Sequence, residues 1–246
     1  MQISLKHLVI VVSLFWSMGA SSQGAEENRA PPREDGIIPL YQGKPFLHVV
    51  HQGRSVKVQR VQDPDYQLHG YFAKTGRRCP PFCLQPMQVD PRVKAIGEIE
   101  VFRFMENQLR DGSGLLIDAR TPKWHKKGTI PGSINVPFSL LRKEINDPET
   151  VGILTMFGAK QRKDTGDFTW KLEKWGVIND PQKTDQWDFS SSKELVLWCN
   201  GPACGQSPRA IQGLLDLGYP AEKIRYYRGG MQLWLLFGLN TVKAQE

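Results

Sequence analysis

Four apolar residues at 195–198 run directly into Cys199, and a loop of small residues and a well-marked helix follow. The apolar run is short enough for a buried strand. We predict a helix from Ser207, which caps its amino end, to Gly218, where it stops. A strand that leads through a short loop into a helix is the repeating unit of α/β folds, so this segment constrains the fold class most.

The same alternation of strands and helices extends over the second half of the chain. Apolar spacing predicts strands at 115–117, 195–198 and 224–227, and helices at 96–109 and 231–237. The chain is therefore expected to be α/β, with three layers around a mainly parallel sheet. Residues 142–193 fit this alternation poorly, and we interpret them as an insertion beside or over the sheet. Its tryptophans, Trp170, Trp175 and Trp187, are expected to form the insertion's own core.

The first part of the chain has a different pattern. Residues 26–36 are polar, contain two adjacent prolines and are predicted to be a linker. Residues 37–92 are predicted to be a small β-rich region, because apolar residues alternate around Gln52-Gly53 as in a hairpin. This region also contains Cys79 and Cys83, and the two prolines between them forbid a helix.

Residues 1–25 are typical of a secretory signal. Lys6 precedes an apolar run at 8–16, and small residues with candidate cleavage sites at Ala20 and Ala25 follow. The run is too short to cross a bilayer comfortably, although an uncleaved anchor or a buried helix is the alternative. We therefore expect an exported, periplasmic protein with no stable membrane insertion after signal cleavage.

The charge balance excludes some classes of function. The 246 residues include 32 Lys and Arg against 25 Asp and Glu, a formal charge of +7. These charges are interspersed, so no nucleic-acid partner is expected. No glycine pattern for nucleotide binding occurs, and nothing indicates haem or flavin, so no cofactor is expected.

The four cysteines form two local pairs, Cys79 with Cys83 and Cys199 with Cys204. Neither pair has the two-residue spacing common to zinc sites and thioredoxin-type motifs, so we expect no metal. In an oxidising compartment Cys79 and Cys83 are candidates for a disulfide.

Cys199 is the candidate nucleophile. It stands where a strand ends and a helix begins, so backbone N–H groups and the positive end of the helix favour its thiolate. The alternative is a small buried apolar residue at a strand end. The predicted substrate-binding loop comprises Asn200, Gly201, Pro202, Ala203, Cys204, Gly205, Gln206 and Ser207.

Three stretches in this order resemble the rhodanese-like sulfurtransferases. They are residues 116–120 with 128–137, the segment from Cys199 through its loop into the helix, and residues 228–230 with Trp234 and Gly238. The resemblance implies a rhodanese-like domain at 93–243, interrupted by the insertion at about 142–193. It also implies that Cys199 takes a sulfane sulfur from a small sulfur-containing anion or persulfide donor. The persulfide then passes that sulfur to a thiol or another thiophilic acceptor.

The loop departs from the family's usual pattern. It is about two residues longer and contains no Lys or Arg, which leaves Arg209 and Arg228 as candidate anion contacts. Asp118 and Arg120 match an acidic and basic pair of the family, which we interpret as a structural ion pair. Related phosphatases of this fold require an Arg six positions after the cysteine, where this chain has Gly205.

Cys204 is a second thiol in the same loop and a candidate resolving thiol, or else a residue that only packs the loop. Two alternatives to sulfur transfer therefore remain open. The first is a periplasmic thiol–disulfide redox protein that uses Cys199 and Cys204. The second is a non-catalytic rhodanese-fold module that binds an exported protein.

Overall fold

A five-stranded sheet forms the centre of the computed structural model, which describes residues 36–163, 168–177, 180 and 182–243. Its strand order is β3-β9-β8-β4-β5, and every neighbouring pair is parallel. The strands are β3 (Lys94–Ala95), β4 (Gly114–Asp118), β5 (Ser133–Asn135), β8 (Glu194–Trp198) and β9 (Ile224–Tyr227). The predicted α/β class and the parallel sheet are confirmed.

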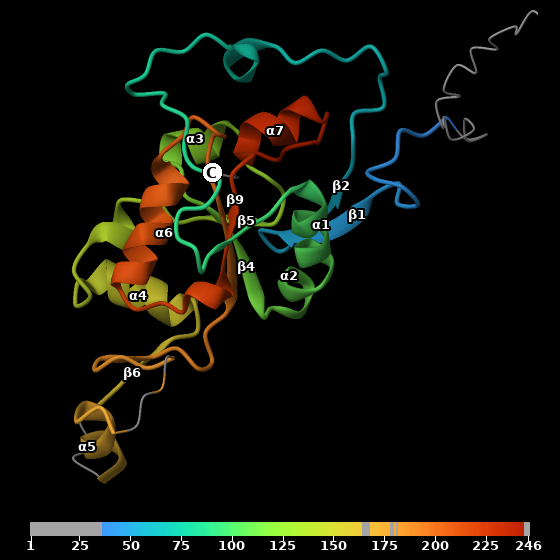
Figure 1. The fold of residues 1–246 in the computed structure, drawn as a ribbon. Coiled ribbons are helices and arrows are strands. Elements are labelled where there is room, and N and C mark those ends of the chain that lie inside the picture. Colours follow the sequence, from blue (N-terminus) through green and yellow to red (C-terminus); the bar gives the residue numbers. More distant parts are fainter. Residues whose placement is uncertain (1–35, 164–167, 178–179, 181, 244–246) are drawn as a thin grey trace, which may run out of the picture. The chain divides into compact units, whose positions relative to one another are not determined.

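Helices cover both faces of this sheet (Figure 1). The helices of the described chain are α1 (Glu98–Glu106), α2 (Gln108–Asp111), α3 (Pro122–Lys127), α4 (Pro148–Met156), α5 (Phe168–Lys174), α6 (Gln206–Asp216) and α7 (Gly230–Leu236). One face packs against α1 and α7, and the other against α4 and α6. Adjacent strand residues point to opposite faces, which explains why the central strands are apolar throughout.

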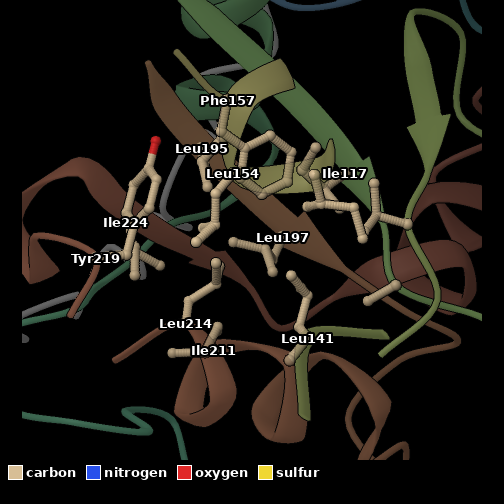
Figure 2. Close-up of a cluster of buried hydrophobic side chains, with 14 of the residues drawn as sticks. Ile117, Leu141, Leu154, Phe157, Leu195, Leu197, Ile211, Leu214, Tyr219 and Ile224 are labelled. Atoms are coloured by element: carbon tan, nitrogen blue, oxygen red, sulfur yellow. The ribbon is translucent and has the colours of Figure 1, made fainter. Parts of the chain in front are cut away.

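The face under α4 and α6 carries one large apolar cluster (Figure 2). Leu195 and Leu197 of β8 contribute to it, whereas Val196 and Trp198 belong to the cluster on the opposite face. The labelled side chains of Figure 2 are Ile117, Leu141, Leu154, Phe157, Leu195, Leu197, Ile211, Leu214, Tyr219 and Ile224. The strand that leads into Cys199 is thus held between two packed layers.

The helix predicted at 96–109 is divided at Asn107 into α1 and α2. The side-chain amide of Asn107 donates a hydrogen bond to the carbonyl of Arg103 at 2.9 Å, and its backbone leaves the helical conformation. Asn side chains that bond to nearby backbone compete with the regular helix. This competition accounts for the break within an otherwise continuous apolar spacing.

The predicted insertion divides into two parts. Its first part packs over the sheet, because Leu154 and Phe157, on and after α4, lie in the same apolar cluster as Leu195 of the central strand. Its second part is an antiparallel pair, β6 (Lys160–Gln161) and β7 (Trp187–Asp188), with α5 between them in sequence. Trp187 is fully buried, but it lies in the main core with Leu195 of the central strand and not in a core of the insertion's own, and Trp175 is 69% exposed.

The β-rich prediction for 37–92 holds only for one hairpin, β1 (Leu47–His51) with β2 (Arg54–Val58). From 59 to 92 the described chain has no named strand, and its prolines, which lack N–H donors, oppose one. Leu47, Val49 and Val58 share a cluster with Trp198 of the central strand. The hairpin therefore packs against one face of the sheet.

Asn240, near the end of the chain, is hydrogen bonded to the hairpin and to the residue after it. The backbone N–H of Gln59 donates to Asn240 Oδ1 at 2.8 Å, and the Asn240 N–H donates back to the Gln59 carbonyl at 3.1 Å. The Asn240 side chain also donates to the carbonyl of Lys57 at 2.8 Å. Residues about 180 positions apart thus form one local hydrogen-bonded unit.

The predicted signal at 1–25 lies outside the described residues. Across the part of the chain that is described, no helix combines the length and apolar character needed to cross a membrane.

Candidate active site

Cys199 directly follows β8, the central strand of the sheet, at its carboxyl end. In the sheet, β4 lies between β5 and β8. The connections from β4 to β5 and from β8 to β9 run in opposite directions across the sheet, so the strand order reverses between β4 and β8. Ligands of open α/β sheets collect at such a switch point. The fold therefore places the sequence's candidate nucleophile where this architecture concentrates its chemistry.

The amino end of α7 is hydrogen bonded to the start of the loop. The N–H of Met231 donates to the Cys199 carbonyl at 2.9 Å, and the N–H of Gln232 donates to the Asn200 carbonyl at 3.1 Å. A Cβ at Gly230, which has a φ of +52°, would stand 2.2 Å from the Cys199 carbonyl oxygen. Only glycine allows this close approach.

The sulfur of Cys199 is buried and lies among hydrogen-bond donors. The hydroxyl of Ser207 donates to it at 3.0 Å, and the Cys199 thiol, when protonated, donates to the carbonyl oxygen of Cys204 at 3.2 Å. The backbone amides of Gly201 and Ser207 also donate to this sulfur. These groups form the cradle that the loop composition predicts.

The cradle changes the acidity of Cys199. Burial raises the pKa of the thiol, but hydrogen bonds from the thiol of Cys204 and from Ser207 outweigh burial and lower the pKa from 9.0 to about 7. The lowered pKa increases the thiolate fraction of Cys199 at neutral pH. The thiolate is the form that attacks sulfur electrophiles.

Ser207 does not cap the helix as predicted. The helix α6 begins one residue earlier, at Gln206, with Gly205 at the N-cap position. The fully buried Ser207 hydroxyl instead points at the Cys199 sulfur, its hydrogen-bond partner. Its position in the first helical turn brings both its hydroxyl and its N–H to the same atom.

Cys204 is the second free thiol of the loop that follows Cys199. Its hydrogen bond to the Cys199 sulfur, together with burial and the neighbouring negative charge, raises its pKa strongly. Cys204 therefore keeps its proton while Cys199 is ionised. Both cysteines are free thiols.

Asp118 and Arg120 form a buried ion pair next to the loop. Arg120 donates to both carboxylate oxygens of Asp118, at 2.8 and 2.7 Å, and to Asn200 Oδ1 at 3.4 Å. Asp118 also accepts from Thr129 at 3.0 Å and contacts His125 Nδ1 at 2.9 Å. Burial raises the Asp118 pKa, but the hydrogen bonds from Arg120 and His125 lower it overall. Through Arg120, the ion pair thus contacts Asn200, the first residue of the loop.

Residues 71–85, which we call the disulfide segment, border the loop. Cys79 and Cys83 are linked by a disulfide within this segment. The N–H of Gln85 donates to the Pro202 carbonyl at 2.8 Å, and Arg228 donates twice to the Gln85 carbonyl, at 3.0 and 2.9 Å. The sequence offered no link between this cysteine pair and the loop, and these contacts supply one.

A pocket of about 850 Å³ opens between the disulfide segment, α3 and the loop. Among the described residues, its cationic side chains are Lys74, Arg77 and Arg209, and no Asp or Glu lines it. Arg209 thus lies where the sequence predicts an anion contact. Arg228 does not line the pocket, because its guanidinium is committed to the disulfide segment.

Cys204 and the other loop residues from Asn200 to Gln206 line the same pocket, whereas the buried Cys199 and Ser207 lie behind them. Sequence reasoning missed Lys74, Arg77, Tyr71 and Trp124, which come from segments with no recognisable motif. Among the described residues, no group of three or more side chains is arranged to hold a metal ion.

A parallel sheet whose central strand ends in a cradled thiolate defines a class of cysteine-dependent α/β domains. A model of the rhodanese-like domain matches residues 103–236, more than half of the chain. The chain belongs to the rhodanese-like domain family. No curated protein matches it.

Several solved structures are similar to the chain at low identity. A protein of unknown function from Rhodopseudomonas palustris, described as a possible tyrosine phosphatase, is 15% identical with a TM-score of 0.40, covering 63% of this chain and 88% of that one. A human single-domain sulfurtransferase is 20% identical with a TM-score of 0.34, covering 58% and 96%. A thiosulfate sulfurtransferase from Pseudomonas aeruginosa is 16% identical with a TM-score of 0.33, covering 62% and 21%.

Proposed function

We propose that this protein is an exported sulfurtransferase that carries a sulfane sulfur as a persulfide on Cys199. The observation that supports it is the thiolate-favouring set of donors around the Cys199 sulfur, from Ser207, Gly201 and Cys204. A thiolate is needed for attack on a sulfane donor.

The transfer has two displacement steps. The Cys199 thiolate attacks the outer sulfur of the donor, a new sulfur–sulfur bond forms, and the donor's own sulfur–sulfur bond breaks. The electron pair of the broken bond leaves with the rest of the donor. An acceptor thiolate then attacks the outer sulfur of the Cys199 persulfide, and Cys199 leaves again as a thiolate.

Export is the second part of the proposal. The pattern at residues 1–25 is typical of a cleaved signal, and the disulfide between Cys79 and Cys83 fits an oxidising compartment. Fractionation of the native host followed by amino-terminal sequencing tests it. Mature protein beginning near residue 21 or 26 in the periplasmic fraction supports export, and full-length protein in the cytosol contradicts it.

Intact-mass analysis tests the transfer. The purified protein is incubated with thiosulfate or with polysulfide, and peptides containing Cys199 and Cys204 are mapped. A gain of about 32 Da, one sulfur atom, on Cys199 is expected, and dithiothreitol should remove it. Cys199→Ser should abolish the gain, whereas Cys204→Ala should retain it. Failure of every sulfane donor to modify the wild-type Cys199 would refute the proposal.

The presence of two free thiols in the same loop, Cys199 and Cys204, favours a second candidate, a dithiol redox protein. The Cys199 thiolate would attack a substrate disulfide, and Cys204 would then attack the resulting mixed disulfide. Two electrons and two protons pass to the substrate, and Cys199 and Cys204 become a disulfide. A mass loss of two protons without gain of sulfur, abolished in Cys204→Ala, identifies this function.

A further inference from the structure

We infer that the pocket between the disulfide segment, α3 and the loop binds a low-molecular-weight organic thiol or persulfide that carries carboxylates. The pocket is lined by Arg77, Lys74 and Arg209 and by aromatic rings. This inference rests on the proposed function, because it names the class of sulfur compound that delivers or accepts sulfur at Cys199.

The size of the pocket argues against a site made only for a small inorganic anion. Its volume of about 850 Å³ lies in the range of about 300–1,000 Å³ that holds organic ligands. Thiosulfate would fill a small part of this space. A thiol with a peptide-sized body would fill it.

The charge of the pocket indicates an anionic occupant. Lys74, Arg77 and Arg209 come from two separate parts of the chain, and they face a lining without acidic side chains among the described residues. Carboxylates pair with guanidinium groups through charge-assisted hydrogen bonds. The organic ligand is therefore expected to carry carboxylates.

Arg77 is held in place before a ligand arrives. It donates a hydrogen bond to the Tyr71 carbonyl, and its guanidinium carbon lies 3.8 Å from the ring centroid of Tyr71 and 5.0 Å from that of Phe82. A cation that is already ordered loses less conformational entropy on binding. This arrangement is typical of a prepared anion contact.

The aromatic rings supply a surface for the ligand's apolar body. Tyr71 and Trp124 lie with their ring centroids 4.6 Å apart, and together with Phe82 they line the pocket. Trp124 belongs to α3, whereas the other two rings belong to the disulfide segment. The segment therefore joins α3 in forming an apolar wall.

The sulfur end of the ligand is expected at the loop. Cys204 lines the pocket, and its carbonyl oxygen lies 3.2 Å from the sulfur of Cys199. A ligand whose carboxylates meet Arg77 can thus extend its sulfur toward the two thiols. The disulfide segment precedes residues 103–236, so this selectivity arises outside the region that matches the family.

The test uses S-methylglutathione, a tripeptide thioether with two carboxylates that cannot exchange sulfur. Its binding to the full mature chain is measured by calorimetry and compared with that of its diethyl ester, which lacks the carboxylate charges. We expect the ester to bind about tenfold more weakly, and binding of the acid to weaken as salt increases.

Three variants locate the site. Arg77→Gln should weaken binding about tenfold and Lys74→Gln a fewfold, whereas Arg54→Gln, an equal charge change on the exposed hairpin strand, should have no effect. Because Arg77 also orders the disulfide segment, exposed Lys74 provides the variant that leaves the fold intact. Equal binding of acid and ester, or unchanged binding in both Lys74→Gln and Arg77→Gln, would overturn the inference.

The two proposals fail separately. A wild-type protein that forms the Cys199 persulfide from polysulfide but does not bind S-methylglutathione refutes only the pocket inference. A protein that binds this probe with the expected charge dependence, yet forms no persulfide with any donor, refutes only the sulfurtransferase proposal.

Discussion

The Ser207→Ala variant tests how the cradle controls Cys199. The substitution removes one buried hydroxyl that donates to the Cys199 sulfur at 3.0 Å, and leaves the Ser207 amide in place. A hydrogen bond to a charged group contributes about 1.5 kcal/mol, and about 1.4 kcal/mol corresponds to one pKa unit. We therefore expect the pKa of Cys199 to rise by about one unit from its value of about 7.

The assay is the rate of iodoacetamide alkylation at Cys199, followed by peptide mass from pH 5 to 10. The readout is the midpoint of the rate–pH profile, which reports the pKa of Cys199. The rate at one pH is a poorer readout, because the thiolate of a weaker acid is also a better nucleophile, by about twofold to threefold per pKa unit. At pH 7 this gain partly offsets the smaller thiolate fraction. At high pH the variant should react faster than the wild type.

Ser192→Ala is the matched control, since its buried hydroxyl donates at 2.6 Å to the carbonyl of Phe189 and not to a cysteine. Its Cys199 midpoint should equal that of the wild type. A Ser207→Ala midpoint that coincides with the control, or lies below it, would refute the assignment of Ser207 as a donor to the thiolate.

Three further outcomes follow from the packing around the site. Asp118→Asn should destabilise the fold by about 3 kcal/mol in urea unfolding, because it leaves the buried guanidinium of Arg120 without its counter-charge, and a loss no larger than that of Asp90→Asn, whose partner Arg92 is exposed, would contradict this. The lowered pKa of Asp118 means that its stabilisation is complete above about pH 4 and is lost as pH falls through the folded-state pKa; the urea midpoint measured from pH 6 to 3 should fall more in wild type than in Asp118→Asn. Gly230→Ala should displace the Cys199 carbonyl, lowering the thermal midpoint and broadening the alkylation profile, and an unchanged profile would show that the loop tolerates the contact.

Local sequence patterns predicted the strands and helices in which apolar residues recur at a regular spacing. The strands at 115–117, 195–198 and 224–227 lie within or coincide with β4, β8 and β9, because buried strands between helices are apolar on both faces. The break at Asn107 was missed, since one side-chain hydrogen bond does not alter the apolar spacing. The exposed position of Trp175 was missed because large aromatic residues are usually buried.

The place of Cys199 between a strand and a helix was predictable, but most of its surroundings were not. Cys199 was found because a strand, a small-residue loop and a helix follow each other directly in the sequence. The pocket residues Lys74 and Arg77 lie more than a hundred positions away, and contacts such as the hydrogen bonds from Gln85 and Arg228 bring their segment to the loop. Contacts of this range leave no periodic signal in a single sequence.

The hydrogen bonds of Asn240 with Lys57 and Gln59 imply an order of assembly. The hairpin near the start of the described chain acquires these partners only after nearly all of the polypeptide has been made. The bonds from Gln85 to Pro202 and from Arg228 to Gln85 also join residues more than a hundred positions apart. Contacts at such long sequence separation form slowly. Because β3 pairs with β9 across a comparable separation, the complete sheet and the wall that gives the pocket its cations both depend on the last part of the chain.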